Sequence, residues 1–140
     1  MTLSPTIAVD MSALAALLFR EPLFKTIRQV LVDAERPRMS IASYVELSTV
    51  AIRRIGEHGW QRADLLIATY KIDLVPFTLD HAKRAADGYQ RYGKGSGHPA
   101  KLNLGDAYTY GFAKAENLPL LFVGDDFVHT DLEPALTTRD

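Results

Sequence analysis

The sequence contains no cysteine, and this absence removes several kinds of site at the outset. Neither a disulfide framework nor a thiolate metal site can form, and thiol chemistry is excluded. Every apolar run is far shorter than the roughly 20 residues that a membrane helix needs. The start, MTLSPTIAVD, lacks the basic beginning and long apolar core of a signal peptide. We therefore expect a cytoplasmic protein that does not enter a membrane.

A strong charge of either sign is also missing. The 16 Lys and Arg residues nearly balance the 17 Asp and Glu residues, so the net charge is −1. This argues against a generally basic nucleic-acid binder, although it is compatible with a local basic surface. With 140 residues and a hydrophobic fraction of 47%, the chain can bury an adequate core. We expect one domain over residues 1–140, without a linker or an internal repeat.

Short apolar segments alternate with helical ones along the chain. The expected strands are 6–9, 38–41, 73–77 and 120–123, with at most one further edge strand at 135–137. The expected helices are 12–19, 21–35, 43–55, 60–70, 78–92 and 103–117. This alternation is typical of a parallel sheet with helices on both faces. We therefore predict an α/β fold with four or five short strands.

Acidic residues gather where this fold would place a ligand. Asp10 follows the first expected strand, and Asp125 and Asp126 follow the fourth. The carboxyl ends of parallel strands share one edge of the sheet, which is where open α/β proteins bind ligands. Asp106 and Glu46 lie in early turns of their helices and can reach the same edge. We therefore expect these acids to lie close together.

Each acid also has an explanation that needs no ligand. Asp106 would interact favourably with the dipole of the helix that it opens, and Glu46 would complete a capping box with Ser43. The two acids after the fourth strand could form a solvated turn, whereas Asp10 has few structural duties. Carboxylates that lie close together nevertheless repel one another and need a proton or a cation. Oxygen ligands without His or Cys favour Mg²⁺ or Mn²⁺.

Three stretches carry a resemblance to a known family. They are VDMSALAALL at 9–18, the helix that contains Glu46, and LNLGDAYTYGFAKAENLPLLFVGDDFVHTD at 102–131. In order and spacing they resemble the PIN-domain ribonucleases, specifically the VapC-type toxins of bacterial toxin–antitoxin modules. The resemblance covers nearly the whole chain. It implies a three-layer α/β/α fold with about five strands, and an Mg²⁺- or Mn²⁺-dependent endoribonuclease that acts on structured RNA such as tRNA or rRNA.

The resemblance also implies which residues carry out catalysis and bind the metal. The expected catalytic acids are Asp10, Glu46, Asp106 and Asp126. Three of them, Asp10, Asp106 and Asp126, are the expected metal ligands, and Glu46, Asp125 and Ser12 are further candidates. Asp126 is preferred to Asp125 because the family usually keeps the aspartate directly before the phenylalanine. Attack by a metal-bound water would leave a 5′-phosphate and a 3′-hydroxyl.

The expected RNA contacts surround the only low-complexity segment, 93–99. Arg91, Lys94, His98 and Lys101 could hold phosphates, although a loop of this kind is also commonly just mobile. For partners, the resemblance implies a homodimer and a small VapB-type antitoxin. The antitoxin would lie in a groove formed by helices 21–35 and 43–55, and one of its arginines could enter the acidic pocket and displace the metal.

Two other functions compete with this one. A response-regulator receiver domain has an acidic Mg²⁺ pocket, but its acidic pair follows the first strand and a lysine follows the last. A PIN fold that binds a partner without cleaving RNA is compatible with the same acids. The histidines at 58, 81, 98 and 129 share no ligand spacing and are expected at the surface. Tyr108, Tyr110 and Phe112 are expected to make core or dimer contacts.

Overall fold

A computed structural model describes residues 6–136, and within that range four parallel strands form one sheet in the order β3-β2-β1-β4. The strands are β1 (Thr6–Val9), β2 (Arg36–Ser40), β3 (Asp73–Val75) and β4 (Leu120–Leu121). The chain begins at a central strand, moves outward through β2 and β3, and then returns to the other side of β1. The predicted α/β class with a parallel sheet is confirmed.

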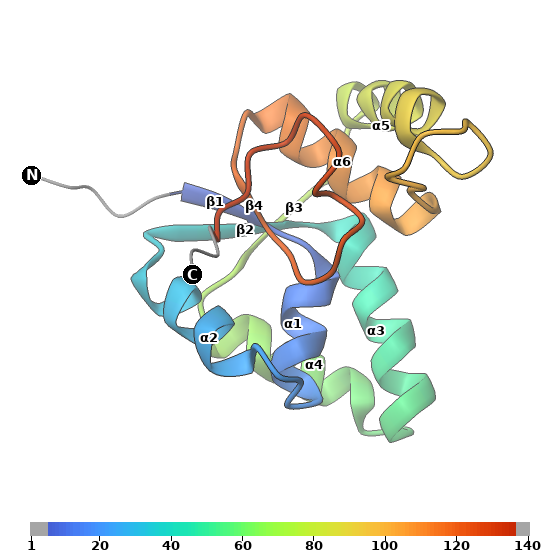
Figure 1. Ribbon diagram of the computed structural model, residues 1–140. Coiled ribbons are helices and arrows are strands. Elements are labelled where there is room, and N and C mark those ends of the chain that lie inside the picture. The colour runs from blue at the N-terminus through green and yellow to red at the C-terminus, as the bar shows by residue number, and fades with distance from the viewer. Residues whose placement is uncertain (1–5, 137–140) are drawn as a thin grey trace, which may run out of the picture.

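Six helices cover the sheet in the described part of the chain. They are α1 (Met11–Leu18), α2 (Phe24–Asp33), α3 (Ile41–Ile55), α4 (Gly59–Thr69), α5 (Leu79–Tyr92) and α6 (Leu104–Glu116). In Figure 1, α5 and α6 lie on one side of the sheet, and α1, α2 and α4 lie on the other, so the fold has three layers. No helix among residues 6–136 is long and apolar enough to cross a membrane.

Strand β1 shows how the apolar runs build two cores. Ile7 and Val9 belong to the core that α1, α2, α3 and α4 cover, while Ala8 belongs to the core beneath α6. Leu121 and Leu120 of β4 divide in the same way. Successive side chains of a strand point to opposite faces. An uninterrupted apolar run is therefore what a strand covered on both faces requires.

Most element ends follow the sequence signals, with small differences. Thr78 and Asn103 cap α5 and α6 with reciprocal capping boxes, and Asn117 ends α6 with a left-handed φ of 55°. Helix α2 begins at Phe24 and not at residue 21, because the backbone N–H of Glu21 still bonds to the end of α1. Strand β4 is two residues long. The expected edge strand at 135–137 lies partly outside the described residues.

The start of α3 corrects a prediction. Ser40 is the N-cap, and its Oγ accepts a hydrogen bond of 3.1 Å from the N–H of Ala42. The predicted capping box of Ser43 and Glu46 is therefore wrong, because the helix already begins at Ile41. Both side chains lie inside the helix and are free of any capping role. Ser43 is buried and Glu46 is half-buried, and both take part in the site described below.

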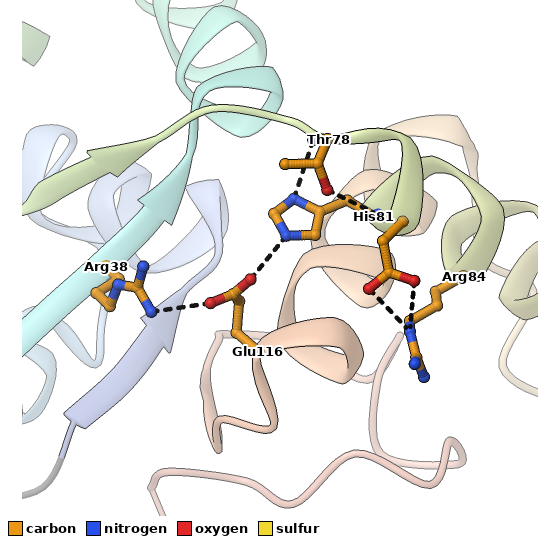
Figure 2. A network of polar contacts seen from close by, with 6 residues as sticks. Arg38, Thr78, His81, Arg84 and Glu116 are labelled. Carbon is orange, nitrogen blue, oxygen red and sulfur yellow. Dashed lines mark hydrogen bonds and ion pairs between the residues drawn. The ribbon is translucent and has the colours of Figure 1, made fainter.

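A polar network joins α5 to α6 and to the sheet (Figure 2). His81 is 2% exposed; its Nδ1 accepts from the Thr78 N–H at 3.3 Å, and its Nε2 donates to Glu116 Oε2 at 2.9 Å. Glu116 also pairs with Arg38 of β2 at 3.1 Å. The hydrogen bond from His81 is the main effect that lowers the pKa of Glu116. The prediction of four surface histidines is wrong for His81, whereas the other three are partly or fully exposed.

Candidate metal centre

Asp10 lies at the carboxyl end of β1 and is 4% exposed. Its Oδ2 accepts from the N–H of Ser12 at 3.1 Å, so Asp10 also caps α1. Its Oδ1 accepts from the hydroxyl of Thr109 at 2.6 Å. Burial raises the pKa of Asp10, although the hydrogen bonds from Ser12 and Thr109 oppose that effect. Among the described residues, no Lys or Arg forms an ion pair with this carboxyl group.

Glu46 approaches the same region from the second turn of α3. Its carboxylate packs directly over Gly105, and a Cβ atom at that position would collide with the carboxylate oxygens. The glycine therefore leaves room for the Glu46 carboxylate between α3 and α6. Burial is the larger effect on Glu46 and repulsion from Asp10 the smaller, and together they raise the pKa of Glu46 to about 7.

Asp106 caps α6 and also interacts with other acids. It closes the capping box of α6: its N–H donates to Asn103 Oδ1 at 2.8 Å, and its Oδ2 accepts from the Asn103 N–H at 3.1 Å. It also lies among the other acids. Burial, aided by the charges of Asp10 and Asp126, raises the pKa of Asp106 to about 7 against the opposing hydrogen bond from Asn103. Capping therefore does not account fully for this residue.

The turn after β4 distinguishes its two aspartates. Asp125 and Asp126 are both exposed, but it is the carboxyl group of Asp126 that interacts with Asp106 and raises its pKa. Asp125 contributes to no pKa shift in the cluster. Phe127 is 3% exposed and anchors the turn by an edge contact with Phe122, with ring centroids 5.4 Å apart. Asp126, and not Asp125, therefore interacts with the cluster through Asp106.

Ser12 supports the same edge of the sheet. Its hydroxyl accepts from the N–H of Val123 at 3.0 Å, which ties the end of β4 to the first turn of α1. Its backbone N–H bonds to Asp10 Oδ2 at 3.1 Å, and hydrogen bonding by Ser12 lowers the pKa of that carboxyl group. These two contacts give Ser12 a structural role whether or not it also touches a metal.

The donor chemistry of the cluster fits a hard divalent cation. Three of the four acids have raised pKa values, and those of Glu46 and Asp106 are raised partly by the charge of other acids in the cluster. A cation would relieve this repulsion. The cluster is nevertheless open: within residues 6–136, no three carboxylate or histidine side chains are close enough to hold one ion as they stand. Mg²⁺ commonly keeps several waters and takes only one or two carboxylates, so water would complete its coordination.

The predicted RNA contacts fall into two groups. Lys94, His98 and Lys101 line one hollow beside the glycine-rich turn, and both lysines are exposed. Arg91 instead pairs with Asp87 at 3.1 Å and donates to the hydroxyl of Tyr110 at 2.7 Å. The structure therefore brings the two lysines together and holds Arg91 in a separate network. As predicted, Tyr110 and Phe112 are core residues; Tyr108 is partly exposed.

Two site residues escaped the sequence analysis. Thr109 and Ser43 are each 1% exposed, and Thr109 bonds to both Ser43 and Asp10. A signal for them does exist in the sequence. Ser43 precedes Glu46 by three residues and Thr109 follows Asp106 by three, and residues three apart share a helix face.

Comparisons with known proteins identify relatives over almost the whole chain. Residues 7–133 match the model of the PIN domain family. Ribonuclease VapC42 of Mycobacterium tuberculosis is 43% identical over 129 residues, which cover 92% of this chain and 98% of that protein. Ribonuclease VapC30 of the same species is 44% identical over 125 residues, with 89% and 94% covered. Ribonuclease VapC of Mycolicibacterium smegmatis is 40% identical over 124 residues, with 89% and 95% covered.

Solved structures share the fold at lower identity. Mycobacterium tuberculosis VapC20, described as a sarcin-ricin loop cleaving toxin, superposes with a TM-score of 0.71 at 18% identity and covers 91% of this chain and 99% of its own. VapBC2 from Rickettsia felis, bound to a promoter DNA fragment, gives a TM-score of 0.72 at 12% identity, with 92% and 96% covered. A toxin–antitoxin complex from Klebsiella pneumoniae gives 0.67 at 22%, with 94% and 96% covered.

Proposed function

This chain belongs to the PIN-domain family, and from that premise we propose that it is a VapC-type endoribonuclease that hydrolyses structured RNA with Mg²⁺ or Mn²⁺. Relatives that are more than 40% identical over most of their length are named ribonucleases. The observation that carries the proposal is the cluster of Asp10, Glu46, Asp106 and Asp126. These acids come from four separate segments, yet Glu46 and Asp106 each interact with Asp10, and Asp106 also interacts with Asp126. None of the four forms an ion pair with a Lys or Arg among the described residues.

The proposal gives each acid a role. Asp10, Asp106 and Asp126 would hold the cation, and Glu46 would reach it directly or through a water. When bound, the ion supplies a more acidic water and positive charge at the phosphoryl centre. Asp10 is fixed on both oxygens, by Ser12 and Thr109, so its orientation does not depend on substrate. Hydrolysis by water predicts products with a 5′-phosphate and a 3′-hydroxyl.

The RNA substrate would be held by the basic residues of the hollow at 94–101. Lys101 lies five residues before Asp106, and it lines the same hollow as Lys94 and His98. Phosphates of a structured RNA such as tRNA or rRNA could bind there while the scissile bond reaches the acids. Arg91 is instead engaged with Asp87 and Tyr110.

We also propose two protein partners. A VapB-type antitoxin would cover α2 and α3, where Val32, Val45 and Ile52 are 62%, 53% and 44% exposed, and would direct an arginine into the acid cluster. Related folds have been solved as toxin–antitoxin complexes, which supports this assignment. A second copy of the chain would cover the apolar groove between α5 and α6, near the exposed Leu79 and Leu104. We place this toxin in the cytoplasm, with its RNA substrate.

The receiver-domain alternative disagrees with the topology. Receivers have the flavodoxin-like strand order 2-1-3-4-5, whereas the described sheet has the order β3-β2-β1-β4. The non-catalytic alternative remains a direct competitor, since a PIN fold could bind a partner through the same surfaces. Cleavage of RNA by the purified protein distinguishes the two.

The test uses the full chain, unfolded and refolded to remove any small protein bound to it. We expect cleavage of structured RNA with Mg²⁺ or Mn²⁺, 5′-phosphate ends on the products, and loss of activity with a chelator or with Asp106→Asn. Asp33→Asn, an exposed acid on α2, is the control and should stay active. Full activity of Asp106→Asn would overturn the assignment, and no cleavage of any RNA would favour the binding module.

A further inference from the structure

Three buried side chains connect three of the four segments that carry the acids. Ser43 of α3 and Thr109 of α6 are each 1% exposed, and Asp10 at the end of β1 is 4% exposed. Ser43 Oγ lies 2.8 Å from Thr109 Oγ1, which lies 2.6 Å from Asp10 Oδ1. The three residues are separated by 33 or more positions in the sequence, so the fold alone brings them together.

The hydrogen bonds that link Ser43, Thr109 and Asp10 run in one direction. The hydroxyl of Thr109 carries a single proton, which it donates to Asp10. Its contact with Ser43 must then use an oxygen lone pair, so Ser43 is the donor. Both bonds therefore run toward the carboxyl group of Asp10. A hydrogen bond to a charged acceptor is roughly twice as strong as a neutral one, which makes Thr109 the stronger of the two contacts.

The two hydroxyls are also one helical turn from acids of the cluster. Ser43 lies three residues before Glu46 on α3, and Thr109 lies three residues after Asp106 on α6. Residues with this spacing occupy the same face of a helix. The contact between the hydroxyls therefore sets the distance between α3 and α6 next to the acids. Gly105 meets the carboxylate of Glu46 in the same interface.

We propose that Ser43 and Thr109 are positioning residues: they orient Asp10 and fix α3 against α6 so that the acids can bind one metal ion together. Thr109 holds Oδ1 of Asp10 and the N–H of Ser12 holds Oδ2, so the plane of the carboxyl group is determined from both sides. This inference rests on the proposed function for its metal, but the hydrogen-bonded chain can be tested without RNA.

A matched control separates the hydroxyl contacts from mere burial. Ser48 is also on α3 and is 6% exposed, but its Oγ donates to the backbone oxygen of Tyr44 at 2.8 Å, within its own helix. Ser43→Ala and Ser48→Ala therefore remove the same buried group from the same helix, and Ser43→Ala alone breaks the contact with α6. Thr109→Val removes the hydroxyl and keeps the shape, and Thr109→Ser restores the hydroxyl.

The experiment measures Mn²⁺ binding to the metal-free protein by calorimetry, together with kcat and KM for RNA cleavage and the thermal midpoint. Loss of a residue that orients a metal ligand commonly costs about 10- to 100-fold in metal affinity or activity. We expect Thr109→Val to weaken Mn²⁺ binding and kcat to this extent with little change in KM. Ser43→Ala should show a smaller loss, and Thr109→Ser and Ser48→Ala should resemble the wild type.

Three results would overturn the inference. They are wild-type Mn²⁺ affinity in folded Thr109→Val, equal losses in Thr109→Ser and Thr109→Val, and equal losses in Ser48→Ala and Ser43→Ala. If Thr109→Val does not fold, the comparison of Ser43→Ala with Ser48→Ala, together with the Mn²⁺ affinity of Thr109→Ser, decides whether the hydroxyls have this role. A wild-type chain that binds Mn²⁺ but cleaves no RNA would refute the proposed function, while the Mn²⁺ affinities would still decide the role of the hydroxyls. A wild-type chain that binds no Mn²⁺ would refute both.

Discussion

Replacing Glu46 by glutamine should stabilise the metal-free protein at high pH. The substitution removes the charge and keeps the shape of the side chain over Gly105. In the folded protein, burial and the charge of Asp10 raise the pKa of Glu46 from 4.5 to about 7. The folded state therefore holds a proton on Glu46 that the unfolded chain has already lost, across the range between these two pKa values.

The sign and size of the effect follow from this difference. Below pH 4.5 both states are protonated, and Glu46 does not affect the free energy of unfolding. As the pH rises toward 7 the free energy of unfolding falls, and it stays lower above pH 7. At 1.36 kcal/mol per pKa unit the full difference is about 3.4 kcal/mol. Because Glu46 is only half-buried, solvent screening reduces this to about 1 to 2 kcal/mol.

Urea unfolding at pH 5 and pH 8 with a chelator present measures the effect, with the single Trp60 as a fluorescent probe. We expect Glu46→Gln to exceed the wild type by about 1 to 2 kcal/mol at pH 8 and by much less at pH 5. Glu57→Gln, at an exposed acid just beyond α3, is the matched control. If Glu46→Gln is no more stable than the wild type at pH 8, the electrostatic account of the cluster is refuted.

Three further predictions concern single residues. Gly105→Ala should lower RNA cleavage because its Cβ would displace the Glu46 carboxylate; an unaltered rate in a cleavage assay would contradict the packing argument. Asp126→Asn should reduce cleavage at least about 10-fold, while Asp125→Asn stays near the wild-type rate; the opposite order would exchange their roles. His81→Ala should lower the free energy of unfolding by about 3 kcal/mol through a cavity and two lost hydrogen bonds; urea titration showing a loss below about 1 kcal/mol would mean that the network of Figure 2 contributes little.

The fold was predictable because its signals are local. The apolar run at 120–123 and the helix expected at 103–117 both depend on residues a few positions apart. The parallel sheet then follows from the alternation of strands and helices. The same rules place Asp10 and the acidic turn at one edge of the sheet, so the position of the candidate site could also be predicted from the sequence.

Other features depend on contacts that local patterns do not contain. Both Ser40 and Ser43 are good capping residues, and the start of α3 is decided by β2, which pairs up to Ser40. The burial of His81 requires Glu116, 35 positions away. The contact of Thr109 with Asp10 spans 99 positions and could only be suspected from helical spacing. Long-range packing therefore decides which polar side chains enter the site.

The central claim is that the acids act together as one cation site, and Mn²⁺ binding at neutral pH tests it most directly. Because the pKa values of Glu46 and Asp106 are about 7, these carboxyl groups must lose protons when a cation binds. Calorimetry in two buffers of different ionisation enthalpy measures both the affinity and the protons released. The account predicts Mn²⁺ binding with proton release in the wild type, weaker binding at pH 6, and loss of binding in Asp106→Asn. Equally tight binding by Asp106→Asn, or binding that releases no protons at pH 7, would contradict it.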